Sequence, residues 1–216
     1  RNVTGVQTCA LPIYHQMHFF FIHNYKTLGT TIFSQLPPGY RRRFYGASTL
    51  HEYEQKNNLK LKRIPPFDKT WNTKVLHMDY VHLDKLFNLG ILGERDVREM
   101  RCIMLVREPI DRFISICNFE NKSPTTIINN LKAGVGDNYY QHKMIKCEQP
   151  WNITCYKTTS TRKIIRFFKQ FNIKLDLSIK KNVSVKTYCI EDLSPEDLDY
   201  LNTYYAEDFK LYNSAE

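Results

Sequence analysis

The chain has 216 residues, of which 42% are hydrophobic and 13% aromatic, with only 8 glycines and 9 prolines. This composition is typical of a folded globular protein and excludes collagen, a coiled coil, a disulfide-rich miniprotein and a disordered chain. Lysine and arginine exceed aspartate and glutamate by 31 to 22, so the net charge is +9. We therefore expect an anionic partner: phosphate, nucleic acid, an acidic glycan or a membrane surface. No apolar run approaches the roughly 18 residues of a membrane-spanning helix.

Residues 1–13 show neither helical nor strand periodicity and resemble a translated sequencing-adapter stretch, so we expect them to be non-native. If these residues replaced a native N-terminus, a targeting or membrane-anchor segment would have been located there. Residues 14–216 contain no linker and no internal repeat, which predicts a single domain. Short apolar runs alternate with helical periodicity along it, a pattern typical of an α/β fold with a central parallel sheet and flanking helices.

The first predicted strand covers residues 18–23, where consecutive apolar residues suit a buried position. A polar turn over 24–29 leads into a helix that begins at Thr30. A basic stretch follows, and then a second strand over 74–78 and a helix over 83–90. Each strand is thus followed by a helix, as a parallel sheet requires.

The third predicted strand, residues 102–106, is a continuous apolar run of the kind that is buried on both faces of a parallel sheet. Pro109 opens the helix after it, in which apolar residues recur at helical spacing. Further helical patterns lie at residues 125–131, 138–145 and 159–171. A late strand over 183–190 precedes a helix with Ser194 as its N-cap and Pro195 at its first position.

The turn after the first strand combines a lysine, a glycine and hydroxyl groups. Lys26, Gly29 and Thr30 lie between a strand and a helix, where backbone N–H groups and the positive helix end face an anion. This is the chemistry of a phosphate-binding turn. It is not a Walker A loop, because the lysine precedes the glycine and the G-x-x-x-x-G-K-[ST] pattern is absent. An ordinary turn with a solvated lysine is the alternative interpretation.

A second motif follows the third strand. Arg107 stands at its carboxyl end, where open α/β sheets bind ligands, and Ser115 lies off the apolar stripe of the next helix. A guanidinium and a hydroxyl suit a second phosphate, while a helix start with capping charges is the alternative. Two anion sites on neighbouring strand ends predict a nucleotide with two separated phosphates.

The two motifs together resemble a known family. Lys26–Thr31 is similar to the 5′-phosphosulfate loop, and Arg107–Ser115 to the 3′-phosphate motif, of sulfotransferases that use 3′-phosphoadenosine 5′-phosphosulfate (PAPS). The resemblance is closest to the heparan sulfate 6-O- and 2-O-sulfotransferases and spans residues 17–213. It implies a P-loop-like sulfotransferase fold, PAPS as donor, a glycan acceptor instead of nucleic acid and, if the protein is eukaryotic, a Golgi location. No metal is expected, because Lys26 and backbone amides already match the charge of the leaving nucleotide phosphate. Three positions depart from the family pattern: Tyr25 replaces proline, Leu28 replaces glycine and Glu108 replaces aspartate.

The resemblance also implies roles for individual residues. His77 matches the family's proposed catalytic base, and an imidazole suits this role because it accepts protons near neutral pH; His82 or an acidic residue is the alternative. Lys26 would neutralise the charge that builds on the bridging oxygen. The nucleotide-binding residues would be Lys26, Thr27, Leu28, Gly29, Thr30, Thr31, Arg107, Ser115 and Lys186, and the acceptor-binding residues Arg42, Asn138 and His142.

The cysteines and glycosylation patterns favour a secretory environment weakly. Cys102 and Cys117 lie in apolar patterns and are expected to be buried thiols. Cys147 and Cys155 bracket a loop-like segment, and the resemblance to the 2-O-sulfotransferases implies a disulfide between them. Asn-x-Ser/Thr patterns, which also arise by chance in an Asn-rich chain, begin at Asn121, Asn152 and Asn182.

Two other functions stay open at this point. A P-loop kinase or NTPase would need a Gly-Lys-[Ser/Thr] sequence and an aspartate that holds Mg²⁺ at a strand end, and neither is seen. A non-catalytic basic module would bind a polyanion through charge alone, with strong salt dependence.

Overall fold

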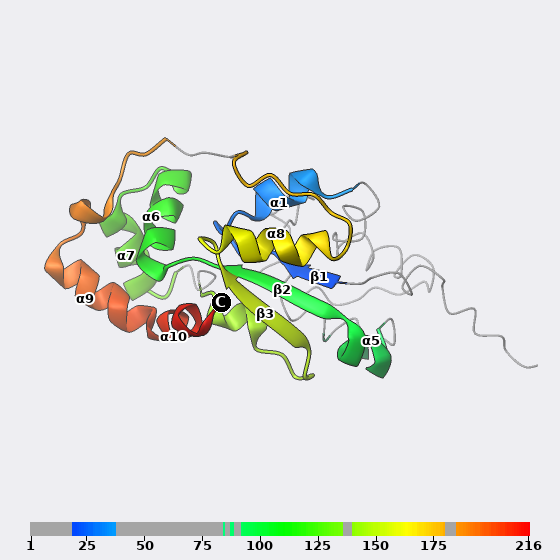
Figure 1. The fold of residues 1–216 in the computed structure, drawn as a ribbon. Coiled ribbons are helices and arrows are strands. Elements are labelled where there is room, and N and C mark those ends of the chain that lie inside the picture. The colour runs from blue at the N-terminus through cyan, green and yellow to red at the C-terminus, as the bar shows by residue number, and fades with distance from the viewer. Residues whose placement is uncertain (1–18, 38–83, 85–86, 89–91, 136–139, 180–184) are drawn as a thin grey trace, which may run out of the picture.

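The computed structural model describes residues 19–37, 84, 87–88, 92–135, 140–179 and 185–216. Three parallel strands form the centre of this part of the chain (Figure 1). β1 (Phe19–Ile22) pairs with β2 (Arg101–Val106), which in turn pairs with β3 (Asn152–Lys157). Because the strands run in one direction, their carboxyl ends meet at one edge of the sheet.

Helices flank the sheet and extend beyond its carboxyl edge, where α6, α7 and α9 lie together (Figure 1). Their bounds are α1 Gly29–Gln35, α5 Glu94–Glu99, α6 Pro109–Glu120, α7 Pro124–Lys132, α8 Thr161–Lys169, α9 Pro195–Tyr204 and α10 Ala206–Ser214, with short 3-10 helices η2 His142–Ile145 and η3 Ile190–Asp192. The α/β architecture with a parallel sheet and flanking helices is thereby confirmed.

Residues of β2 contribute to two hydrophobic clusters, because side chains of a strand alternate between its faces. Cys102, Met104 and Val106 pack with residues of α5, η2 and α10 on one face. Ile103 and Leu105 pack with residues of α1 and α8 on the other. All five are fully buried, as the continuous apolar run predicts.

Elements with strong local signals lie where the sequence predicts them. The apolar runs form β1 and β2, and α1 begins at Gly29, one residue before the predicted start. α6 begins at Pro109, and its N-cap Glu108 accepts a hydrogen bond from the N–H of Asp111. α9 begins at Pro195 in the same way, with Ser194 as its cap.

Three predictions of local structure were wrong in the described residues. The loop-like segment predicted between Cys147 and Cys155 contains the first residues of β3, the third strand of the sheet. Residues 185–189 form no strand. The N–H groups of Thr187 and Tyr188 donate hydrogen bonds to the Asn118 carboxamide oxygen, whereas in a strand they would donate to the backbone of a neighbouring strand. The sequence predicts a helix over 138–145, but the described residues 140–145 contain only the short 3-10 helix η2.

The predicted disulfide is not formed, because Cys147 and Cys155 are both thiols in the structure. The segment between them is held by the buried carboxylate of Asp84. This carboxylate accepts hydrogen bonds from the N–H of Glu148 at 2.7 Å and from the indole N–H of Trp151 at 2.9 Å. A buried carboxylate with these donors fixes the loop without a covalent link. Cys102 and Cys117 are buried thiols, as predicted.

Within the described ranges, no helix combines the length and the apolar character that crossing a membrane would need. The predicted strand over 74–78 and residues 1–13 lie outside the described residues. The assignment of 14–216 to a single domain stays a prediction.

Candidate functional site

Two cations meet at the carboxyl edge of the sheet. Lys26 lies in the turn between β1 and α1, and Arg107 directly follows β2, the neighbouring strand. Burial lowers the pKa of the Lys26 ammonium, and the positive charge of Arg107 lowers it further. Burial also lowers the pKa of Arg107, against the opposing effect of Asp111 and Glu108. Holding two partly desolvated cations together costs free energy, and an anion bound beside both would remove this cost.

The backbone of the turn after β1 is strained. Lys26 and Leu28 have φ angles of 62° and 65°, in the left-handed region that favours glycine. For residues with a Cβ atom this conformation costs about 1–2 kcal/mol each. Such strain persists only where the surrounding structure imposes it, and it is concentrated at functional sites.

Hydrogen bonds from inside and outside the turn impose its shape. The Thr27 hydroxyl donates to the carbonyl of Asn24 at 2.8 Å, which closes the turn on itself. The Arg112 guanidinium, from α6, donates through Nε to the carbonyl of Tyr25 at 3.0 Å. The residue before Lys26 is therefore attached to the helix that follows Arg107.

Gly29 leaves no room for a side chain where the turn enters α1. A Cβ atom built on this residue would lie 1.7 Å from Nε2 of His23, which is itself buried. The close approach brings the start of α1 against the end of β1. Glycine is required here by space rather than by an unusual φ angle.

Gln141 connects the two turns. Its side-chain oxygen accepts hydrogen bonds from the Asn24 carboxamide at 2.9 Å and from the N–H of Arg107 at 3.0 Å. Its side-chain nitrogen donates to the carbonyl of Arg107 at 2.8 Å. Because Gln141 is fully buried, these bonds are shielded from water and hold the ends of β1 and β2 in register.

Asp208 forms the centre of a second buried group of polar side chains. Its carboxylate accepts hydrogen bonds from the N–H groups of Gln141 and His142, both at 2.8 Å. A third contact joins it to Nδ1 of His142 at 2.6 Å, and Arg112 Nη1 lies 3.9 Å away. Asp208 and Arg112 are almost completely buried, so their opposite charges compensate each other in the interior.

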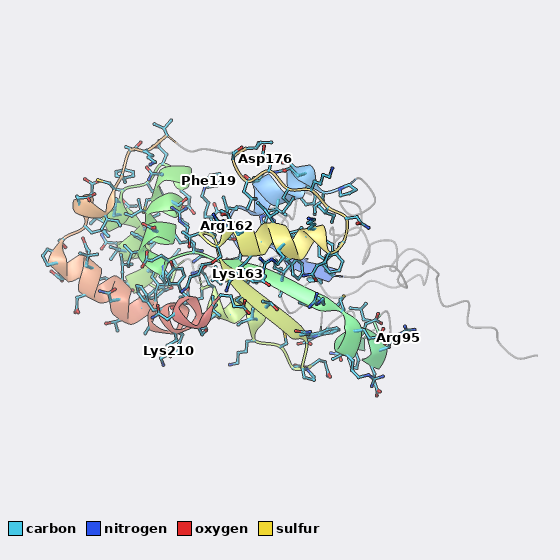
Figure 2. The ribbon with its side chains drawn as sticks, viewed as in Figure 1. Arg95, Phe119, Arg162, Lys163, Asp176 and Lys210 are labelled. Atoms are coloured by element: carbon cyan, nitrogen blue, oxygen red, sulfur yellow. The ribbon has the colours of Figure 1, made fainter. Side chains whose placement is uncertain are left out.

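An aromatic ring lies against the ammonium of Lys26. Nζ stands 4.3 Å from the centre of the Phe119 ring, on the side of α6 that faces α1 (Figure 2). Phe119 is 50% exposed, and Lys26 is half-buried. The ring supports the ammonium through a cation–π contact and offers an apolar surface next to the two cations.

The predicted nucleotide-site residues that the structure describes lie at the ends of two neighbouring strands and on α1, α6 and a late segment. Lys26, Thr27 and Leu28 lie in the turn after β1, Gly29, Thr30 and Thr31 in the first turn of α1, Arg107 directly after β2, and Ser115 half-buried on α6. Lys186 is exposed in an irregular segment whose next residues are bound to Asn118 of α6. His142 is half-buried and bound to Asp208. His77, Arg42 and Asn138 lie outside the described residues.

Sequence reasoning missed the residues that hold the turns in place. Asn24, Gln141, Arg112 and Asp208 make the connecting hydrogen bonds and ion pair, and their partners are distant in sequence. Arg112 is fully buried, and neither its burial nor its carboxylate partner can be read from the sequence. For the two amides, only the folded chain shows what they bind.

No family model, no curated protein and no solved structure matches this chain. Among the described residues, no group of three or more His, Cys, Asp and Glu side chains is placed to hold a metal ion.

Proposed function

We propose that this chain is a PAPS-dependent sulfotransferase with a P-loop-like sulfotransferase fold, which moves a sulfuryl group to a hydroxyl of a glycan. The observation that carries the proposal is the meeting of Lys26 and Arg107 on neighbouring strand ends. Both side chains are partly desolvated there, and their positive charges repel each other. A ligand with two anionic groups relieves both costs.

The three departures from the family pattern are compatible with this proposal. Leu28 stands where the family has glycine, and it adopts the left-handed conformation that glycine would adopt without strain. Glu108, in place of aspartate, still caps α6. Tyr25, in place of proline, supplies the carbonyl that Arg112 binds. The turn therefore keeps the shape that a glycine permits, at the cost of local strain.

Each group of the site has a role in the proposed transfer. PAPS supplies an activated sulfuryl group with a nucleotide as its leaving group. Lys26 neutralises the charge that develops on the bridging oxygen, and residues Thr27–Thr31 hold the 5′-phosphosulfate. Arg107 and Ser115 hold the 3′-phosphate. The acceptor hydroxyl loses its proton as its oxygen attacks sulfur, and the resemblance gives this proton to His77.

The proposal is tested by calorimetry with 3′-phosphoadenosine 5′-phosphate (PAP) in the absence of Mg²⁺. We expect saturable binding of one PAP per chain. Lys26→Ala and Arg107→Ala each remove a charge-assisted contact and should weaken binding about tenfold or more. Arg95→Ala is the matched control, because Arg95 is an exposed cation on α5, away from the carboxyl edge (Figure 2).

The outcomes separate the three functions. Binding that requires Mg²⁺ would indicate a kinase or NTPase. Salt-sensitive binding of heparin without saturable PAP binding would indicate a polyanion-binding module. Sulfate transfer from labelled PAPS that survives Lys26→Ala would contradict the role of Lys26, and transfer that survives His77→Ala would contradict only the base role that the resemblance gives to His77.

A further inference from the structure

His142 and Asp208 form an imidazole–carboxylate pair that the nucleotide site does not use. Nδ1 of His142 lies 2.6 Å from Oδ1 of Asp208. The Asp208 side chain is completely buried, whereas 28% of the His142 side chain is exposed. The pair thus joins a buried carboxylate to an imidazole that solvent reaches.

The carboxylate is held in one orientation. It accepts hydrogen bonds from the N–H groups of Gln141 and His142, and Arg112 of α6 compensates its charge from 3.9 Å. An acceptor fixed in this way keeps the proton of the neutral imidazole on Nδ1. Nε2 is then the nitrogen that carries the lone pair, on a side chain that is 28% exposed.

Two routes of direct contact connect the pair to the turn that holds Lys26. Gln141, the residue before His142, binds both Asn24 and the main chain of Arg107. From Asp208, the Arg112 guanidinium reaches the carbonyl of Tyr25, which precedes Lys26. The imidazole therefore belongs to the same rigid group of elements as the two cations.

We infer that His142 accepts the proton of the acceptor hydroxyl and that Asp208 is its positioning residue. Nε2 takes the proton while the hydroxyl oxygen forms its bond to sulfur and the bond from sulfur to the phosphate oxygen of the nucleotide breaks. Asp208 stabilises the imidazolium that results. The inference rests on the proposed function and assigns to His142 the base role that the resemblance gives to His77.

Charged and titratable groups surround the imidazole on each side that the structure describes. Asp208 and Glu207 of α10 place negative charge near it, and Arg112 of α6 places positive charge beside Asp208. On its own segment, Tyr140 packs edge-on at 5.2 Å, and Lys143 lies over the Tyr140 ring. Of the two carboxylates, Asp208 contacts the imidazole directly, whereas Glu207 is exposed and pairs with Lys210.

The experiment is the pH dependence of sulfate transfer from labelled PAPS to desulfated heparin, measured with the full chain. We expect the wild-type rate to fall at low pH, because a protonated imidazole accepts no further proton. His142→Gln should lower kcat at neutral pH about 100-fold and abolish this fall, without changing the affinity for PAP. Asp208→Asn should also lower kcat without changing the affinity for PAP, because the imidazole loses its charged acceptor, whereas Glu207→Gln, an exposed neighbour with the same loss of charge, should leave kcat unchanged.

A nitrogen NMR spectrum of the wild-type protein adds a measurement that does not depend on Asp208→Asn folding. It should show the His142 proton on Nδ1 at neutral pH, and a proton on Nε2 would overturn the inference. So would a His142→Gln protein that keeps both its kcat and the fall at low pH while it binds PAP. Absence of PAP binding by the wild type would overturn the proposed function and this inference with it.

Discussion

The two turns that hold Lys26 and Arg107 have opposite designs. The turn after β2 is stabilised locally, because Glu108 caps α6 and Pro109 occupies its first position. The turn after β1 has two left-handed residues, and no side chain caps α1. Its shape depends on Arg112 and Gln141, which are distant in sequence. A turn whose shape is imposed by distant residues can hold a strained backbone conformation at a binding site. A turn that its own residues stabilise does not depend on such distant contacts.

The largest effect is expected from Arg112→Leu, which removes the external support of the first turn. The Asp208 carboxylate would lose its compensating charge, and the carbonyl of Tyr25 would lose its donor. Breaking a buried ion pair in this way should lower the free energy of unfolding by about 4 kcal/mol, measured with urea. Arg95→Leu breaks an exposed pair on α5 and should leave the midpoint unchanged. Equal losses in the two variants would contradict the external support.

Gly29→Ala tests whether the first turn has any spare room. The new methyl group would overlap the imidazole of His23, so we expect a loss of about 3 kcal/mol in the free energy of unfolding. Gly93→Ala is the matched control, because the nearest atom to its Cβ position is 3.9 Å away. That change should cost less than about 1 kcal/mol. If Gly29→Ala proves as mild as the control, the approach of α1 to β1 is looser than described.

Leu28 allows a measurement of the strain itself. Leu28→Ala and Leu28→Gly both remove the side chain, which packs at the edge of the cluster beneath α1. At an ordinary helical position alanine is more stable than glycine, but at φ 65° the order should be reversed by about 1 kcal/mol. Thermal unfolding of the two variants decides this. The usual order, with alanine the more stable, would show that the turn carries no strain at this residue.

The smallest effect concerns the pKa of Lys26, which burial and Arg107 hold below 10.5. Between the folded-state value and 10.5 the unfolded chain binds more protons, so stability rises as pH increases through this window. Arg107→Gln should raise the pKa of Lys26 and reduce that rise, and bound PAP should raise the pKa in the wild type. The chemical shift of the Lys26 Cε atom reports both changes. An identical titration in wild type and Arg107→Gln would show that the two cations do not interact.

Elements with local signals could be predicted from the sequence. β2 is a continuous apolar run, and α6 and α9 have a proline at the first position and a capping residue before it. The positions of Lys26 and Arg107 followed from the same signals, because each comes directly after a predicted strand. The effect of Arg107 on the pKa of Lys26 required the pairing of β1 with β2.

Features that depend on distant partners could not be predicted. β3 is a short strand whose residues are only partly buried, so no clean apolar alternation distinguishes it from a loop. The loop before it is fixed by Asp84, more than 60 residues earlier, where the sequence suggested a disulfide. Gln141 looks like an ordinary surface residue until Asn24 and Arg107 are placed on either side of it.

The parallel sheet also determines when the two cations first meet during folding. Phe19 of β1 pairs with Arg101 of β2, so closure of this pair brings together segments that are far apart along the chain. Pairings of this kind form slowly, because the entropy of a long loop is lost before any contact is gained. The anion site therefore forms when β1 pairs with β2, and a chain in which these two strands are unpaired has no anion site.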